Sequence, residues 1–126
     1  MSETTFSNVP EFIESLQEHS GDLLLCRCCT TPITHHTETI TIGISTNYRF
    51  TNAANITFPI TCYRNAPGCS IAGVPTEEDS WFGGYYWQLA NCDECGEHLG
   101  WYYQNEKERF FFGLIQDRLT IKKENK

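Results

Sequence analysis

The sequence predicts a single, mostly β domain of antiparallel strands with one short helix before it. Three observations lead to this fold class. The chain has 126 residues, a length that suits one hydrophobic core and not two. From residue 22 onward apolar and polar residues alternate with period two, and Gly, Pro and Asn separate the alternating runs. Helical spacing is confined to residues 1–20. We therefore expect a tail and helix over 1–20, a folded domain over 21–121 and a disordered tail over 122–126.

The N-terminal helix is predicted from its cap and its apolar face. Asn8 and Glu11 have the spacing of a capping box, and Gly21 can end the helix. Between them the apolar residues follow one helix face at positions 9, 12, 13 and 16.

The strands are predicted from alternation and the breaks between them from turn residues. Isoleucines alternate with Thr and Gly over 40–44, and apolar residues alternate over 56–62. Pro59 lacks a backbone donor, which confines its strand to an edge or a bulge. The three phenylalanines at 110–112 indicate a strand that contributes to the core. Turns are expected at 31–32, 65–68, 83–84 and 95–96.

Charge excludes several classes of partner. The chain has nine Lys and Arg residues and 16 Asp and Glu residues, which give a formal charge of -7. Nucleic acids and anionic membranes attract clustered basic residues, so we expect neither as a partner. No apolar run approaches the roughly 18 residues of a spanning helix, and no signal peptide is evident in the first 25 residues. We expect a soluble protein, either cytoplasmic or the mature form of a secreted one.

Four of the seven cysteines predict a structural zinc site. Cys26 and Cys29 form one C-x-x-C pair, and Cys92 and Cys95 form another. Such a pair lets two thiolates from one tight turn reach the same ion, and four thiolates complete a tetrahedron with no open position for catalysis. Because 62 residues separate the pairs, the metal would join two distant hairpins. Gly96 suits the positive φ that such a turn needs.

Another interpretation of the cysteines is a redox pair or a set of disulfides. The sequon at Asn55 would then fit a secreted protein. An odd number of cysteines favours the zinc site, with Cys28, Cys62 and Cys69 outside it. Cys62 alternates with buried positions and is expected in the core.

The aromatic residues are concentrated in one segment. Eleven of the 17 aromatics, including all three tryptophans, lie between residues 81 and 112. Trp81 and Trp87 are expected on opposite arms of a hairpin about Gly83-Gly84. The turn at 92–95 then folds the strand of Trp87 against the strand of Trp101, with Trp101 and Tyr103 on one face and His98 pointing away.

Three converging indoles indicate a ligand cage more than a dry core, because an indole N–H is costly to bury unpaired. The residues alone allow two guests. A quaternary ammonium would be held by the ring faces, with help from Glu77, Glu78 and Asp79. A compact neutral ring would stack on the walls while backbone groups before Trp81 read its polar edge.

The combined motifs resemble one known family. They comprise the segment Ser80 to Trp87, the pair Cys92 and Cys95, the segment His98 to Tyr103, the segment Phe112 to Ile115, and Asp117 to Leu119. Together they closely resemble the CULT domain, the thalidomide-binding domain of the cereblon family, over about residues 25–119. The resemblance implies a β-tent fold of two antiparallel sheets pinned by one zinc ion.

The resemblance also implies a ligand and a mode of binding. Trp81, Trp87 and Trp101 would wall a cage for a glutarimide ring, with Tyr103 at its base. The Asp79 carbonyl would accept the imide N–H, and the N–H of Trp81, after Ser80, would donate to a ring carbonyl. Asn52 would lie over the other half of the ligand. The expected partners are small cyclic imides or the cyclised C-terminal Asn or Gln of damaged proteins.

Two positions depart from the family pattern. Ala53 stands where proline commonly follows the asparagine, and Asp79 stands where relatives have histidine or an aromatic residue. The part of cereblon that docks on the ligase adaptor has no counterpart in 126 residues, so no such docking is expected from this chain alone. A methionine sulfoxide reductase B-like enzyme is the catalytic alternative. It would need a reactive cysteine beyond the four ligands, and only Cys62 in the core and Cys69 in a turn lie outside the two C-x-x-C segments, since Cys28 lies within the first.

Overall fold

The computed structural model describes residues 22–123 as nine strands and two short 3-10 helices. Their bounds are β1 Asp22–Cys26, β2 Pro32–His35, η1 His36–Glu38, β3 Asn47–Thr51, β4 Thr57–Tyr63, β5 Cys69–Thr76, β6 Tyr85–Cys92, β7 His98–Asn105, β8 Phe110–Ile115, η2 Gln116–Arg118 and β9 Leu119–Lys123. The helix predicted within residues 1–20 lies outside the described residues. No helix between residues 22 and 123 is long and apolar enough to cross a membrane.

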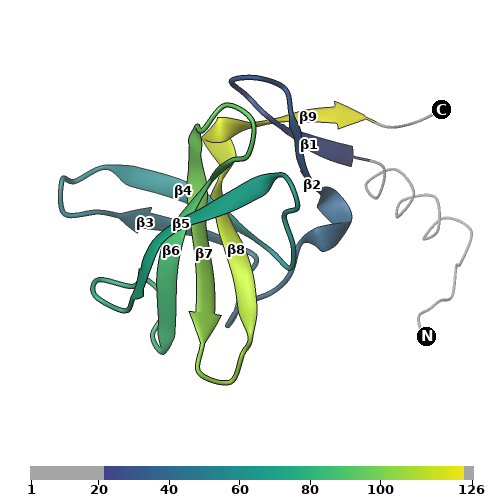
Figure 1. Cartoon of the computed structure of the whole chain (residues 1–126). Helices are drawn as coiled ribbons and strands as arrows, with labels where there is room; N and C mark the ends of the chain where they lie inside the picture. The colour runs from purple at the N-terminus through teal and green to yellow at the C-terminus, as the bar shows by residue number, and fades with distance from the viewer. Residues whose placement is uncertain (1–21, 124–126) are drawn as a thin grey trace, which may run out of the picture.

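The strands form two antiparallel sheets, as the sequence predicts. The smaller sheet has the order β2-β1-β9 and the larger one the order β3-β4-β8-β7-β6-β5. In Figure 1 the smaller sheet lies at one end of the molecule, and the chain passes from β8 through η2 into β9 to reach it. The β3–β4 turn and the β5–β6 connection lie together on the opposite side.

Two clusters of buried side chains form the core. The first contains buried residues of both sheets, among them Leu24 and Ile33 of the smaller sheet and Leu99 and Leu114 of the larger one. The second lies on the other face of the larger sheet and comprises Cys62, Phe82, Tyr103 and Phe111. Adjacent residues of one strand therefore serve different clusters, because side chains alternate between faces.

The predicted strand over residues 40–44 is wrong. The segment forms a turn, with an isolated bridge between Ile42 and Ser45 and with Ile44 94% exposed. Gly43 has φ 71, and the Tyr48 hydroxyl donates to the Ile42 carbonyl. Ile40 and Ile42 still pack against the second cluster, so two of the three alternating isoleucines contribute to the core from outside a strand.

The predicted C-terminal tail begins too early. Strand β9 continues through Lys123, with Lys122 opposite Leu23 and Lys123 opposite Asp22. The polar composition of residues 122 and 123 suggested disorder, but backbone pairing with β1 does not depend on apolar side chains.

The prediction that Pro59 confines its strand to an edge or a bulge is wrong for β4 as a whole, because β4 lies between β3 and β8. Strand β4 has neighbours on both sides, yet its pairing with β8 begins only at Ile60. Pro59 therefore pairs with Arg49 of β3 alone, at a part of β4 that is locally an edge.

A bulge between β6 and β7 gives His98 an orientation opposite to the predicted one. Ala90 pairs with Gly100 while Asn91 pairs with His98, so β7 holds one extra residue. The extra residue moves His98 to the face of Trp101, and their ring centroids lie 5.0 Å apart, edge to face. The prediction that His98 points away from Trp101 is therefore wrong.

Gly100 lets β7 approach β8 at this bulge. A Cβ atom at Gly100 would stand 2.1 Å from the carbonyl oxygen of Gly113 and 2.8 Å from the Cα atom of Leu114. Both obstacles are backbone atoms of a central strand, so neither can move without disturbing the sheet.

We predict that Gly100→Ala lowers the free energy of unfolding by about 3 kcal/mol, because the added methyl group overpacks two central strands. Gly83→Ala is the matched control, since a Cβ atom there meets nothing within 4 Å. Urea denaturation of both variants checks the prediction, and equal stability of the two would contradict it.

Candidate metal centre and aromatic pocket

Four cysteine thiols meet between the two sheets. Cys26 ends β1 and Cys29 follows in the next turn, while Cys92 ends β6 and Cys95 follows in its turn. The four Sγ atoms lie within 4.8 Å of one another. The closest pairs join the two turns, with Cys26 3.7 Å from Cys95 and Cys29 3.6 Å from Cys92. The cluster therefore links the smaller sheet to the larger one, as the spacing of the pairs predicts.

The two cysteine turns share one backbone scheme. In the first, the Cys26 N–H donates to the Thr31 carbonyl (2.8 Å) and the Cys26 carbonyl accepts from the Thr30 N–H (2.7 Å). In the second, the Cys92 N–H donates to the Glu97 backbone carbonyl (2.8 Å) and the Cys92 carbonyl accepts from the Gly96 N–H (2.9 Å). The equivalent residues Thr30 and Gly96 have positive φ values of 63 and 81. Each turn thus presents two thiols on one side.

The thiol cluster has a geometry suited to zinc. Zn–S bonds of about 2.3 Å place the sulfurs of a tetrahedron about 3.8 Å apart, close to the shortest distances here. The same distances are far longer than the about 2.05 Å of a disulfide bond, and all seven cysteines are free. Hydrogen bonds from Thr31 lower the pKa of Cys29 to about 6, which favours its thiolate, whereas burial raises the pKa of Cys26. Four thiolates fill the tetrahedron and indicate a structural role.

The remaining cysteines lie outside the cluster. Cys28 is exposed. Cys62 is fully buried in the second core cluster, as predicted, and Cys69 is partly buried against the first. Burial raises the pKa values of Cys62 and Cys69 to about 12, which disfavours their thiolates.

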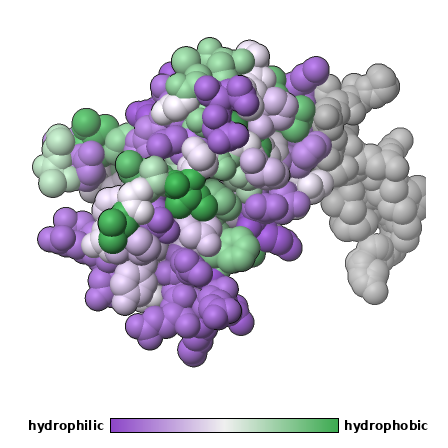
Figure 2. Space-filling model, viewed as in Figure 1, coloured by the Kyte–Doolittle hydropathy of each residue, from purple (hydrophilic) through white to green (hydrophobic). Residues whose placement is uncertain are grey.

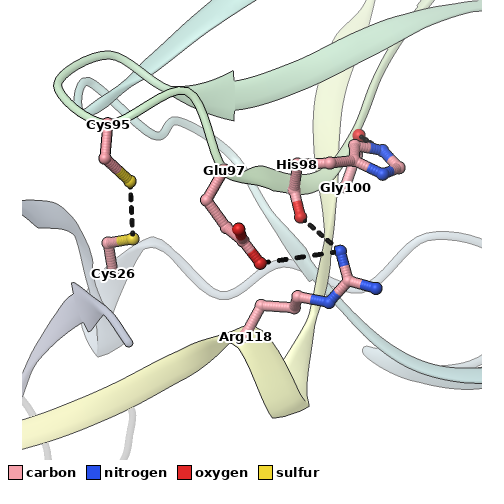
Figure 3. Close-up of polar contacts among 6 residues, drawn as sticks. All are labelled: Cys26, Cys95, Glu97, His98, Gly100 and Arg118. Carbon is pink, nitrogen blue, oxygen red and sulfur yellow. Dashed lines mark hydrogen bonds and ion pairs between the residues drawn. The ribbon is translucent and has the colours of Figure 1, made fainter. Parts of the chain in front are cut away.

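Arg118 connects the cysteine turns to the β6–β7 hairpin (Figure 3). Its carbonyl accepts the Arg27 N–H at 3.0 Å, which ties η2 to the first cysteine turn. Its guanidinium donates to the His98 carbonyl at 2.6 Å and lies 4.0 Å from the Glu97 carboxylate. It also lies 6.0 Å from the centroid of the Phe58 ring. One side chain thus contacts the second cysteine turn, β7 and β4.

A pocket of about 800 Å³ opens on the second core cluster. All seven residues predicted for the ligand site line it, namely Asn52, Asp79, Ser80, Trp81, Trp87, Trp101 and Tyr103. Thr51 at the end of β3 and Ala53 and Ala54 of the β3–β4 turn also line it and were not predicted. These three residues could have been predicted from the sequence, because they lie within two positions of Asn52. On the face shown in Figure 2, apolar residues also reach the surface over β5 and at the β3–β4 turn.

Strands β6 and β7 position two tryptophans by register. Trp87 stands opposite Tyr103, and Leu89 stands opposite Trp101, so Trp87, Trp101 and Tyr103 share one face, in agreement with the predicted alternation. Tyr103 is 2% exposed, and its burial raises its pKa.

Trp81 lies in the β5–β6 loop and not in a strand. The prediction that Trp81 and Trp87 stand on opposite arms of a hairpin is therefore wrong for Trp81. The tight turn of this loop is closed by the Tyr85 N–H donating to the Phe82 carbonyl at 3.0 Å. The Trp81 ring stacks on Phe50 at 4.8 Å and meets Trp101 edge to face at 5.0 Å. It therefore adjoins the wall formed by Trp101.

Hydrogen bonds hold the β5–β6 loop against β6. The Trp87 indole N–H donates to the Glu78 carbonyl at 2.9 Å, and the Ser80 N–H donates to the Glu77 carbonyl at 3.1 Å. Asp79 has a φ of 59, uncommon for a residue with a side chain. Among the described residues, no hydrogen bond engages the Asp79 carbonyl or the Trp81 backbone N–H.

Asn52 organises the β3–β4 turn. Its side-chain oxygen accepts the N–H groups of Ala54 (2.9 Å) and Ile56 (3.0 Å), and its own N–H donates to the Ile56 carbonyl (2.9 Å). The turn therefore keeps a defined shape with Ala53 in place of proline.

The fold and the two sites define a small β domain with a zinc-type cysteine centre and an aromatic pocket. No family model matches the chain. It is similar to protein cereblon of Drosophila virilis, with 31% identity in an alignment of 109 positions that covers 80% of this chain and 17% of the fly protein. Cereblon of Drosophila willistoni is 33% identical over 78% of the chain, and chicken cereblon is 38% identical over 48% of it.

The chain is thus cereblon-like over about four fifths of its length, consistent with a CULT domain. It spans about a sixth of the length of the fly proteins.

We predict that the protein binds one zinc ion and that Cys26→Ser removes it, because a hydroxyl is a poor replacement for a buried thiolate ligand. Elemental analysis of the purified protein and thermal unfolding with and without a chelator check this. Cys28→Ser is the matched control and should retain the metal and the melting temperature. Zinc retained by Cys26→Ser at wild-type stoichiometry would argue against this ligand set.

Proposed function

We propose that the domain is a non-catalytic binding module for cyclic imides. The expected ligands are the glutarimide ring of thalidomide-type compounds and C-terminal cyclic imides of damaged proteins. The observation that carries this proposal is the combination of three indoles around one pocket with two unengaged backbone groups, the Asp79 carbonyl and the Trp81 N–H.

The two backbone groups match the polar edge of an imide. An imide presents an N–H donor flanked by carbonyl acceptors. In the proposed complex the Asp79 carbonyl accepts the imide N–H, and the Trp81 N–H donates to a neighbouring ring carbonyl. Ser80 lies between them and fixes the loop, because its hydroxyl donates to the Phe82 carbonyl at 3.0 Å.

The aromatic side chains would enclose the apolar part of the ring. Trp81, Trp87 and Trp101 form the walls and Tyr103 the base, and Asn52 lies over the part of the ligand outside the cage. The walls are already supported before a ligand arrives. Trp81 stacks on Phe50, and Trp101 packs edge to face against both Phe58 (5.6 Å) and His98 (5.0 Å). Such preorganisation lowers the entropic cost of binding, and we expect micromolar affinity, about -8 kcal/mol, for so small a ligand.

The same features favour an imide over the alternative guests. A quaternary ammonium ion would use the ring faces but would leave the Trp81 N–H without an acceptor. A sulfoxide reductase would need a reactive thiol in the pocket. None of the pocket-lining residues is a cysteine, and burial raises the pKa values of Cys62 and Cys69 to about 12.

We predict that thalidomide quenches the intrinsic tryptophan fluorescence saturably, and that Trp101→Ala weakens binding at least about tenfold through the loss of one stacking wall. Isothermal titration calorimetry gives the affinities independently of the fluorescence.

Phe110→Leu is the matched control, because Phe110 packs against Tyr102 away from the pocket residues and is 48% exposed. It should bind like the wild type. A glutarimide methylated on the imide nitrogen should fail to bind, since it has no proton for the Asp79 carbonyl. Absence of thalidomide binding to the folded wild type, or tighter binding of a trimethylammonium ligand, would rule the proposal out.

A further inference from the structure

The pocket lining contains one acidic residue and no basic residue. Among its ten lining residues, Asp79 alone carries a charge at neutral pH. Glu77 and Glu78 precede it in the same loop, and all three acids are exposed. No lysine, arginine or histidine lines the pocket. A ligand there meets a carboxylate with no basic residue opposite.

Hydrogen bonds fix the backbone of the loop that carries Asp79 at the pocket. The Glu78 N–H donates to the Thr76 hydroxyl at 3.1 Å, and the Glu78 carbonyl accepts from the Trp87 indole at 2.9 Å. The Ser80 N–H closes a turn onto the Glu77 carbonyl. These bonds lie on both sides of Asp79, whose backbone adopts φ 59. The side chain therefore projects from a defined backbone position.

No cation of the described chain neutralises this loop. None of Glu77, Glu78 and Asp79 forms an ion pair with another described residue. Arg49 of the nearby β3 is exposed between Tyr48 and Phe50, which pack on the second core cluster, so alternation directs Arg49 away from that cluster. Arg118 contacts Glu97 on the side of the cysteine turns.

The pocket also has room beyond the indoles. Its lining continues from the tryptophans onto the β3–β4 turn through Thr51, Ala53 and Ala54, which are small side chains without charge. A ring enclosed by three indoles would leave this part of the pocket to the group attached to the ring. That group would pass between the β3–β4 turn and the loop that carries Asp79.

We propose that Asp79 is a specificity-determining residue that selects cyclic imides bearing a cationic group outside the cage. This inference rests on the proposed imide site and adds the class of ligand. It favours an imide attached to an ammonium or guanidinium group, such as a peptide with lysine or arginine next to a C-terminal cyclic imide. A carboxylate at the same place is repelled, and a neutral group is tolerated.

Three glutarimides of matched length test the selection. Their outer groups are a primary ammonium, its neutral acetamide and a carboxylate, and calorimetry measures their affinities for the zinc-loaded protein at low and high salt. We expect the ammonium ligand to bind about two- to fivefold more tightly than the acetamide, the range of a partly exposed ion pair. The carboxylate ligand should bind more weakly than both. Added salt should reduce the differences in affinity among the three ligands, because it screens their interaction with the carboxylate.

Two variants separate Asp79 from the general negative charge. Asp79→Asn keeps the backbone carbonyl and removes the charge, and the ratio of its affinities for the ammonium and acetamide ligands should fall to about one, whatever its absolute affinity for the ring. Glu106→Gln removes an equal charge from the β7–β8 turn, outside the pocket lining, and should keep the preference. A preference that survives Asp79→Asn, or that Glu106→Gln also abolishes, overturns the assignment.

The two proposals fail in different ways. Equal affinities of the three ligands for the wild type would overturn the selection by Asp79 and leave imide binding intact. Absence of binding by all three to the folded wild type would overturn the imide site, and the inference with it.

Discussion

The meeting of four thiols between two separate turns is the constraint on which the rest of the structure depends. Closing a segment of 62 residues between Cys29 and Cys92 is entropically costly, and a metal suited to this cluster would offset that cost. The second turn joins β6 to β7, the strands that carry Trp87, Trp101 and Tyr103. Trp87 lies five residues before Cys92, about 17 Å along the strand. The cysteine centre therefore fixes one end of the hairpin whose other part forms the pocket.

The bulge in β7 lies between the cysteine centre and the pocket residues of the β6–β7 hairpin. Gly100 permits β7 to lie against the backbone of β8, and the extra residue turns His98 toward Trp101. The His98 carbonyl accepts from Arg118, whose own carbonyl accepts from the first cysteine turn. The support behind the Trp101 wall thus runs through hydrogen bonds to both sheets. The packing of an aromatic wall and the position of the metal site are parts of one arrangement.

The sequence predicts those features that depend on neighbouring residues and misses those that depend on distant ones. Short spacing identifies both cysteine pairs, and alternation places Trp101 and Tyr103 on one face. The orientation of His98 depends instead on a bulge at which Gly100 lies against the backbone of another strand, and Lys123 pairs with Asp22, about a hundred residues earlier in the sequence. Over 40–44 the isoleucines alternate, but the segment forms a turn in which Ile40 and Ile42 pack against the second core cluster and Ile44 is 94% exposed. Alternation alone therefore does not predict a strand here, because pairing requires a partner strand that the local pattern does not contain.

The β5–β6 loop separates two functions by using different atoms for each. In the proposed complex the imide is recognised by the main-chain carbonyl of residue 79 and the main-chain N–H of Trp81. Any residue at position 79 can supply that carbonyl if it adopts the same φ. The side chain at that position is then available to select the rest of the ligand. Aspartate is among the residues that tolerate positive φ, so it fits the backbone requirement and adds a charge. A substitution there can change the preferred outer group while recognition of the ring is retained, because the three indoles and the loop hydrogen bonds lie outside the substituted side chain.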